Sequence, residues 1–323
     1  MRKRKWLAVG LAVCLLLAGL SGCAGQQRQL RVTLVLKTVT EVAEFWGTLL
    51  SGVEKAAAEY GVELKVLTAP REVDIDEQIE LIRQVTAEKP DVMILSASDY
   101  DRCAEATEEA IAAGIGVVAV DTDVNAAGRA CFVGSNNYEV GLEMGRAMAS
   151  YLPEGGKVAV IQHMLTTTTG IDRTRGVIDA LTKAGNIEIL GSFCCDNSTD
   201  RAQSLTKELL EQTPDISGFV CTNEVCNVGA ANALVKLGMG GKVFVVGCDN
   251  SQRQIAFLEQ NIIQAIVTQR PFNMGYIAVQ QAVEVASGEK TADFVEVPCV
   301  LITRENMYTQ ENQKLLFPLT GES

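Results

Sequence analysis

The sequence predicts an α/β protein made of two lobes, each built on a parallel sheet with helices on both faces. Apolar runs of strand length alternate with amphipathic helical segments along the chain. Most of these runs have no polar face, which is typical of strands that are covered on both sides. The alternation occurs twice in 323 residues, a length that suits two cores better than one.

The first half of the chain contains four strand-like runs separated by helices. We expect strands at 31–36, 62–67, 92–95 and 116–120. In the second run, Glu63 and Lys65 alternate with apolar residues, which indicates a strand at the edge of a sheet.

Helical spacing and start signals mark the intervening helices. The segment 44–60 has apolar residues at every fourth position: Phe45, Leu49, Val53 and Ala57. A second helix is expected after Asp74, because Asp74 followed by Glu77 resembles a capping box. A third is expected near 102–113.

The second half repeats the pattern. We expect strands at 157–161, 187–190, 218–221, 243–247 and 265–267, and helices near 171–184, 200–212, 225–237 and 252–260. Ligands of such sheets bind beyond the carboxyl ends of the strands, so two facing lobes predict a cleft between them.

The amino terminus predicts export and lipid anchoring. Residues 2–5 are all basic, residues 6–20 carry no charge, and Leu20-Ser21-Gly22-Cys23 resembles a bacterial lipobox. An uncleaved membrane helix would need a longer apolar run and would not explain the cysteine. We therefore expect a lipoprotein signal peptide at 1–22, a lipidated Cys23 and a polar tether at 23–29. The mature protein would be extracytoplasmic and held on the membrane by its lipid, on the outer face or the periplasmic side.

Charge and composition exclude several classes of partner. The formal net charge is −12, and loss of the four basic residues of the signal peptide would make it about −16. Such a chain has no basic face for nucleic acid. There is one histidine and no pair of CxxC motifs, so we expect no metal and no cofactor.

The cysteines are expected to be reduced. Ten are present, of which Cys14 lies in the signal peptide and Cys23 takes lipid. The remaining eight include the adjacent pair Cys194-Cys195, whose bridging would strain the backbone, and several that fall in or beside apolar strands.

Polar residues follow five of the predicted strands. They are Ser96, Asp121 with Thr122, Asn223, Asp249 and Gln269. Each alone is typical of a helix N-cap or a turn. Together they could project into one cleft, where carboxylates and amides can bind neighbouring hydroxyls of a polyol. Arg175 could add a planar donor group, and Phe45 and Trp46 could cover the C–H face of a sugar.

Seven motifs in order resemble the landmarks of the type I periplasmic binding proteins, closest to their ribose-binding branch. They are Leu36-Lys37-Thr38, Glu44-Phe45-Trp46, Val120-Asp121, Asp172-Arg173-Thr174-Arg175-Gly176, Thr222-Asn223-Glu224, Gly247-Cys248-Asp249 and Gln269-Arg270-Pro271. The resemblance implies two Rossmann-like lobes, 30–135 plus 270–298 and 136–269 plus 299–323. It also implies three crossings between them, near 134–136, 268–270 and 297–300.

The same resemblance implies the ligand contacts. They fall on Phe45, Trp46, Asp121, Arg175, Asn223, Asp249 and Gln269. The chain departs from the ribose-binding pattern at Lys37, Glu44, Ser96 and Thr122. These departures put plain ribose in question as the ligand. Lys37 and Glu44 could pair with each other, or one of them could meet a charged or larger ligand.

The function that follows is capture of a sugar or sugar-like ligand by a monomeric binding lipoprotein, which delivers it to the permease of an ABC importer. The alternative is a receptor of the same fold that reports an autoinducer or nucleoside to a membrane sensor. An exported hydrolase is disfavoured, because no G-x-S-x-G motif exists and His163 is the one imidazole. His163 follows a strand and could border the cleft, but we expect it to be structural or solvent-facing. We expect no catalytic residue. The signal peptide and the missing DNA-binding segment exclude a repressor of the related fold.

Overall fold

The computed structural model describes residues 28–39 and 44–317. The predicted signal peptide, Cys23 and most of the predicted tether therefore lie outside the described residues. Within them, no helix is both long and apolar enough to cross a membrane.

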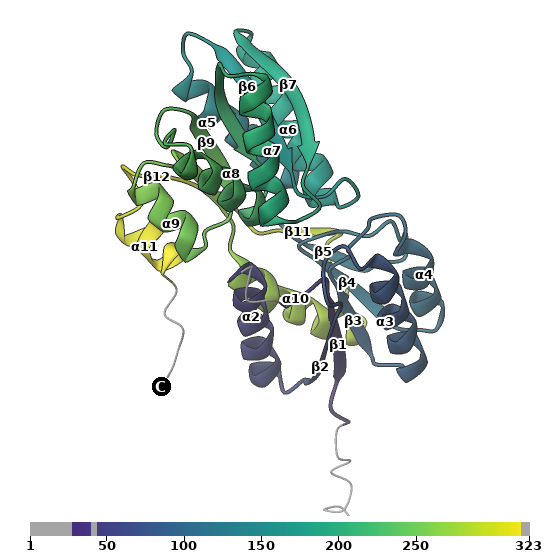
Figure 1. The fold of residues 1–323 in the computed structure, drawn as a ribbon. Helices are drawn as coiled ribbons and strands as arrows, with labels where there is room; N and C mark the ends of the chain where they lie inside the picture. The colour runs from purple at the N-terminus through teal and green to yellow at the C-terminus, as the bar shows by residue number, and fades with distance from the viewer. Residues whose placement is uncertain (1–27, 40–43, 318–323) are drawn as a thin grey trace, which may run out of the picture.

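Two six-stranded sheets form the centres of two lobes (Figure 1). The first sheet has the strand order β11-β5-β4-β3-β1-β2, and all its neighbouring strands are parallel. Its strands are β1 (Arg31–Leu36), β2 (Glu63–Thr68), β3 (Val92–Leu95), β4 (Gly116–Val120), β5 (Cys131–Gly134) and β11 (Phe294–Glu296). The predicted edge position of β2 is confirmed.

The second sheet has the order β12-β10-β9-β8-β6-β7. Its neighbours are parallel except that β12 runs antiparallel to β10. Its strands are β6 (Gly156–Gln162), β7 (Ile187–Cys194), β8 (Ile216–Cys221), β9 (Phe244–Cys248), β10 (Ala265–Thr268) and β12 (Val300–Thr303). The predicted fold class is confirmed.

Helices cover the sheets in packed pairs. In the first lobe α2 (Glu44–Tyr60) packs on α10 (Pro271–Ala286), and α3 (Ile75–Glu88) packs on α4 (Ala104–Ala112). In the second lobe the packed pairs are α5 (Asn137–Tyr151) with α6 (Thr168–Ala184), and α7 (Thr199–Gln212) with α8 (Glu224–Lys236). The remaining helices are α9 (Gln252–Glu259) and α11 (Gln310–Leu316).

The chain passes between the lobes at three places. They are the connections from β5 to α5, from β10 to α10 and from β11 to β12. Figure 1 shows β11 and the segment before α10 in the narrow region between the lobes. Each sheet is buried under its own apolar clusters, with Leu34 and Ile94 at the centre of the first lobe and Phe219 and Ile161 at the centre of the second. The apolar cores therefore lie within the lobes and not between them.

Some elements were not predicted. They are β5, α5, α10, β11, β12 and α11. The capping box expected at Asp74 is wrong, although α3 begins where expected. The carboxylate of Asp74 caps no backbone amide and instead accepts from Arg71 Nε at 3.0 Å.

All eight cysteines of the described residues are free thiols, as expected. Six are buried, while Cys194 and Cys299 are partly buried. The Sγ atoms of Cys195 and Cys226 lie 3.6 Å apart.

Candidate functional site

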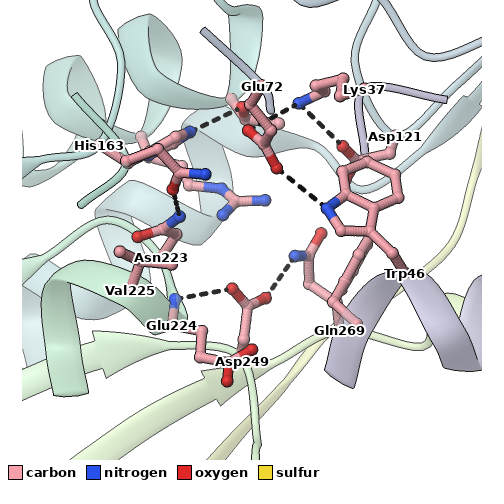
Figure 2. A pocket seen from close by; sticks show the side chains of 14 residues that line it. Lys37, Trp46, Glu72, Asp121, His163, Asn223, Glu224, Val225, Asp249 and Gln269 are labelled. Atoms are coloured by element: carbon pink, nitrogen blue, oxygen red, sulfur yellow. Dashed lines mark hydrogen bonds and ion pairs between the residues drawn. The ribbon is translucent and has the colours of Figure 1, made fainter. Parts of the chain in front are cut away.

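A polar pocket lies between the carboxyl ends of the two sheets (Figure 2). It encloses about 410 Å³ of empty space, part of it open to solvent. The lining residues are Lys37, Phe45, Trp46, Glu72, Asp121, His163, Thr169, Arg173, Asn197, Asn223, Glu224, Val225, Asp249 and Gln269.

The wall from the first lobe is a buried ionic cluster. Lys37 follows β1, and its Nζ lies 3.5 Å from Asp121 Oδ2 and 3.9 Å from Glu72 Oε2. The indole nitrogen of Trp46 donates to Glu72 Oε1 at 2.9 Å, and Lys37 Nζ lies 5.2 Å from the centre of the Trp46 ring. Only 2% of Lys37 is exposed, so its charge depends on these two carboxylates for compensation.

The wall from the second lobe contains a buried arginine. Arg173 Nε donates to Asn137 Oδ1 and its Nη1 donates to the carbonyl of Thr222, both at 2.9 Å. Helices α5 and α6 approach closely here, because a Cβ at Gly141 would lie 2.1 Å from the carbonyl oxygen of Arg173. Two fixed bonds and close helix packing hold the guanidinium against the pocket.

His163 lies beside Arg173 and is uncharged. Its Nδ1 is 2.8 Å from Thr222 Oγ1, and its Nε2 is 3.1 Å from Thr169 Oγ1. Burial, with Arg173 and Lys37 nearby, keeps the pKa of His163 well below its ordinary value. Both ring nitrogens lie within hydrogen-bonding distance of threonine hydroxyls, and the uncharged imidazole lines the pocket.

Asp121 and Asp249 occupy equivalent places in the two lobes. Asp121 follows β4 and donates its backbone N–H to Val133, while Asp249 follows β9 and donates to Val267. Both have left-handed backbone conformations, with φ of 61° and 73°. This conformation is costly for a non-glycine residue and is typical of functional positions.

Asp249 also organises the floor of the pocket. Its Oδ1 accepts from Gln269 Nε2 at 2.7 Å, and its Oδ2 accepts from the backbone N–H of Glu224 at 3.0 Å. Burial, followed by the nearby charge of Asp249, raises the pKa of Glu224 to about 8. At neutral pH the Glu224 carboxyl is thus mostly protonated and can donate a hydrogen bond.

Asn223 is held by its own helix. Its Oδ1 caps α8 by accepting from the backbone N–H of Cys226 at 3.0 Å, and its Nδ2 donates to Asn197 Oδ1 at 2.8 Å. The side chain lines the pocket with its orientation fixed by these two bonds.

Seven of the eleven residues expected at the site line this pocket. They are Lys37, Phe45, Trp46, Asp121, Asn223, Asp249 and Gln269. Three of the others lie nearby without lining it. Ser96 is fully buried, the Thr122 hydroxyl donates to Asp121 Oδ2 at 2.9 Å, and the Glu44 carboxylate accepts from the backbone N–H of Gln252 at 3.3 Å. Glu44 therefore does not pair with Lys37.

The expectation for Arg175 needs a correction. Its side chain is 61% exposed, its Nη2 lies 3.1 Å from Asp172 Oδ1, and its guanidinium stacks 4.9 Å from the Tyr138 ring centre. Arg173, two residues earlier on α6, is the arginine of the pocket. Successive helical residues point about 100° apart, so a shift of two moves a side chain to the opposite face.

The sequence analysis also missed other lining residues. They are Glu72, His163, Thr169, Asn197, Glu224 and Val225. Glu224 directly follows Asn223, and Glu72 lies in the loop that follows β2. Both are polar residues that follow a strand, which is the pattern that predicted Asp121, Asn223 and Asp249.

Comparison with known proteins gives a consistent picture. The model of the periplasmic binding protein domain matches residues 33–290. The D-allose-binding periplasmic protein of Escherichia coli (strain K12) is 26% identical over 285 residues, which cover 84% of this chain and 91% of that protein.

Solved structures agree in fold. A sugar transporter from Clostridium phytofermentans has a TM-score of 0.79 and 30% identity, covering 85% of this chain and 99% of the other. A carbohydrate transporter solute binding protein from Agrobacterium radiobacter, in complex with D-arabinose, has a TM-score of 0.86 at 23% identity, covering 90% of this chain and all of the other. The similarity to the Agrobacterium radiobacter protein supports the fold only.

Proposed function

This chain belongs to the periplasmic binding protein family, and on that premise we propose that it captures a sugar between its two lobes and delivers it to an ABC importer. The relatives are described as a D-allose-binding protein, ribose import binding proteins and sugar transporters. The chain is accordingly a binding protein and not an enzyme. Its partners are a sugar and the importer's permease.

One observation carries the proposal: two carboxylates face one pocket from equivalent strand ends of opposite lobes. Asp121 and Asp249 are set by the same strained backbone conformation, so each is pre-positioned before a ligand arrives. A carboxylate can accept from two neighbouring hydroxyls, which is the geometry of a sugar ring. Closure of the two lobes on one ring would pair hydroxyls on both of its sides.

The other lining residues supply the complementary chemistry. We assign hydrogen-bond donation to Lys37, Arg173 and Gln269, whose nitrogens already face carboxylates or carbonyls at the pocket. Phe45 and Trp46 pack edge to face, with ring centres 5.1 Å apart, and offer apolar surface for the C–H groups of the sugar. Asn223 completes the set.

The lobes are in contact, which supports a hinge mechanism. The backbone N–H of Tyr100 donates to the carbonyl of Thr166 at 2.9 Å, and that of Asp123 donates to Thr168 Oγ1 at 3.2 Å. On the other side of the pocket, Gln252 donates to Glu44. We infer that the lobes, 30–135 plus 270–298 and 136–269 plus 299–323, open by breaking these few bonds.

The amino-terminal segment supports an extracytoplasmic location with a lipid anchor. The lipobox-like Leu20-Ser21-Gly22-Cys23 would place the lipid on Cys23, a few residues before the first strand at Arg31. The anchor would hold the binding protein close to the permease that it serves.

A thermal-shift screen tests the function. The chain without its signal peptide is heated with pentoses, hexoses, polyols and nucleosides, each over a range of concentrations. A ligand that binds only the folded state raises the melting temperature in proportion to the logarithm of its concentration. A rise with one or more sugars is expected, whereas a rise with nucleosides alone would favour a receptor for such signals. No shift with any sugar would contradict sugar capture.

A further inference from the structure

A second cavity adjoins the polar pocket between the lobes, which we call the sugar pocket from here on. It is lined by Glu44, Phe45, Thr48, Glu224, Asp249, Asn250, Ser251, Arg270, Pro271, Phe272, Asn273, Glu311, Lys314, Leu315 and Leu316. We call it the side pocket. It encloses about 1010 Å³ of empty space, part of it open to solvent, against about 410 Å³ for the sugar pocket. Its lining residues come from the starts of α2 and α10 in the first lobe and from the start of α9 and from α11 in the second.

The two cavities meet at shared side chains. Phe45, Glu224 and Asp249 line both. Asp249 turns its carboxylate to Gln269 and the Glu224 amide, while Glu224 brings a carboxyl group to the junction. The two cavities are therefore direct neighbours at these three residues.

Contacts of the described residues hold the side pocket in shape. Asn250 Nδ2 donates to the carbonyl of Leu315 at 3.2 Å and so fastens α11 to the start of α9. The bond from Gln252 to Glu44 joins the opposite lobes at its rim. The space is thus enclosed by both lobes when they are in contact.

The lining fits an uncharged ring. Phe272 is 40% exposed and, with Pro271 and Leu315, offers apolar surface of the kind that covers a sugar or aromatic face. The lining has more acidic than basic side chains. Glu44, Asp249 and Glu311 are acidic, Glu224 adds a mostly protonated carboxyl group, and Arg270 and Lys314 are basic. This excess of acidic groups disfavours an anionic occupant.

One buried donor in this lining has no partner. The Nε of Arg270 is fully buried and forms no hydrogen bond among the described residues. This unpaired donor costs free energy, but the atom has no exposed surface through which a ligand in the side pocket could reach it.

We propose that the ligand is a neutral glycoside, with one sugar ring in the sugar pocket and a second, linked ring in the side pocket. The second ring packs against Phe272. This inference rests on the proposed capture of sugars and deepens it by naming the class of sugar.

Isothermal titration calorimetry on the chain without its signal peptide tests this. For each sugar that shifts the melting temperature, the probes are the methyl glycoside, a disaccharide and the p-nitrophenyl glycoside of the same sugar. At least one linked form is expected to bind ten-fold or more tightly than the methyl glycoside. Phe272→Ala should lower the affinity for that linked form at least five-fold and leave the methyl glycoside unchanged.

Two further variants make the test specific. Phe294→Ala is a matched control, because Phe294 is 37% exposed but lies on β11 outside both cavities, and it should change neither affinity. Asn273→Trp replaces an exposed residue with a side chain that fills the side pocket, and it should weaken binding of the linked form only.

The possible results distinguish failure of the proposed side-pocket subsite from failure of the proposed sugar capture. If methyl glycosides bind but no linked form binds more tightly, or if Phe272→Ala and Asn273→Trp weaken both forms equally, the side pocket is not a subsite and sugar capture stands. If no sugar binds in either form, sugar capture and the glycoside inference fall together.

Discussion

The indole nitrogen of Trp46 and the buried carboxylate of Glu72 are joined by a hydrogen bond of 2.9 Å. This bond connects the first turn of α2 with the loop after β2, and Lys37 stands against the same carboxylate. Trp46 is both a core residue, packed with Leu49 and Val53, and a lining residue of the pocket. In the first lobe, a side chain that lines the pocket is therefore also part of the hydrophobic core.

Trp46→Phe should lower both stability and affinity. The change removes the donor to Glu72 and leaves a buried carboxylate with less compensation, at about 1–3 kcal/mol of unfolding free energy. Affinity for the identified sugar should fall as well, because Glu72 and Lys37 lose their fixed positions. Urea unfolding without ligand and calorimetry with ligand measure the two effects. An unchanged unfolding free energy would mean that the Trp46–Glu72 bond does not stabilise the lobe.

Asp121→Ala and Asp249→Ala should each weaken sugar binding by about 2–4 kcal/mol, because ligand hydroxyls would lose a charged acceptor in a dry cleft. Asp215→Ala is the control, since Asp215 is exposed and pairs with Lys157 away from the pocket. Calorimetry gives the dissociation constants. Near-wild-type affinity in either pocket variant would remove that aspartate from the proposed site.

Arg173→Lys and Arg175→Lys form a matched pair on one helix. Arg173→Lys should cost about 2–3 kcal/mol of stability and most of the affinity, since an ammonium cannot reproduce the bonds to Asn137 and Thr222. Arg175→Lys should change neither, because its side chain is at the surface. The reverse ranking in unfolding and binding measurements would restore Arg175 to the site.

Glu224 should make the stability of the ligand-free protein depend on pH. Its pKa is about 8 in the folded protein and near the ordinary 4.5 when unfolded. The stability contributed by the protonated form is fully present below pH 4.5 and is lost as the pH rises toward 8, because the unfolded chain releases this proton first. Asp249, Glu44 and Ser251 are the groups that act on it.

Glu224→Gln should remove this component of the pH dependence, so that the variant gains stability over the wild type between pH 5 and pH 8. Glu211→Gln, at an exposed position, is the control. Urea unfolding at several pH values provides the comparison. Parallel curves for wild type and Glu224→Gln would show that Glu224 ionises normally.

Cys23→Ala tests the lipid anchor. The variant should accumulate as uncleaved precursor or leave the membrane fraction, because the lipid-accepting thiol is gone. Fractionation and intact-mass measurement of both forms decide the matter. Normal processing and acylation of the variant would contradict the lipobox interpretation.

The sequence by itself determined the alternation of strands and helices and the main strand-end residues. Central strands such as β3 are uninterrupted apolar runs, and helices such as α2 have a regular apolar face, so local pattern was sufficient for these elements. Asp121, Asn223 and Asp249 were found because a strand's end fixes where the next side chain lies. Among the elements that were missed, β11 has only three residues, and α5 contains small residues such as Gly141 and Gly145 in its buried face.

Only the tertiary structure decided which side chains face the ligand. The choice of Arg173 over Arg175 depends on how α6 is rotated against α5, and that rotation is set by the close approach at Gly141. The partners of Lys37 come from β4 and from the loop after β2, which are distant in the sequence, so its pairing with Asp121 and Glu72 could not be inferred from spacing. Helix rotation and long-range ion pairs are properties of packing, and no local pattern in the chain encodes them.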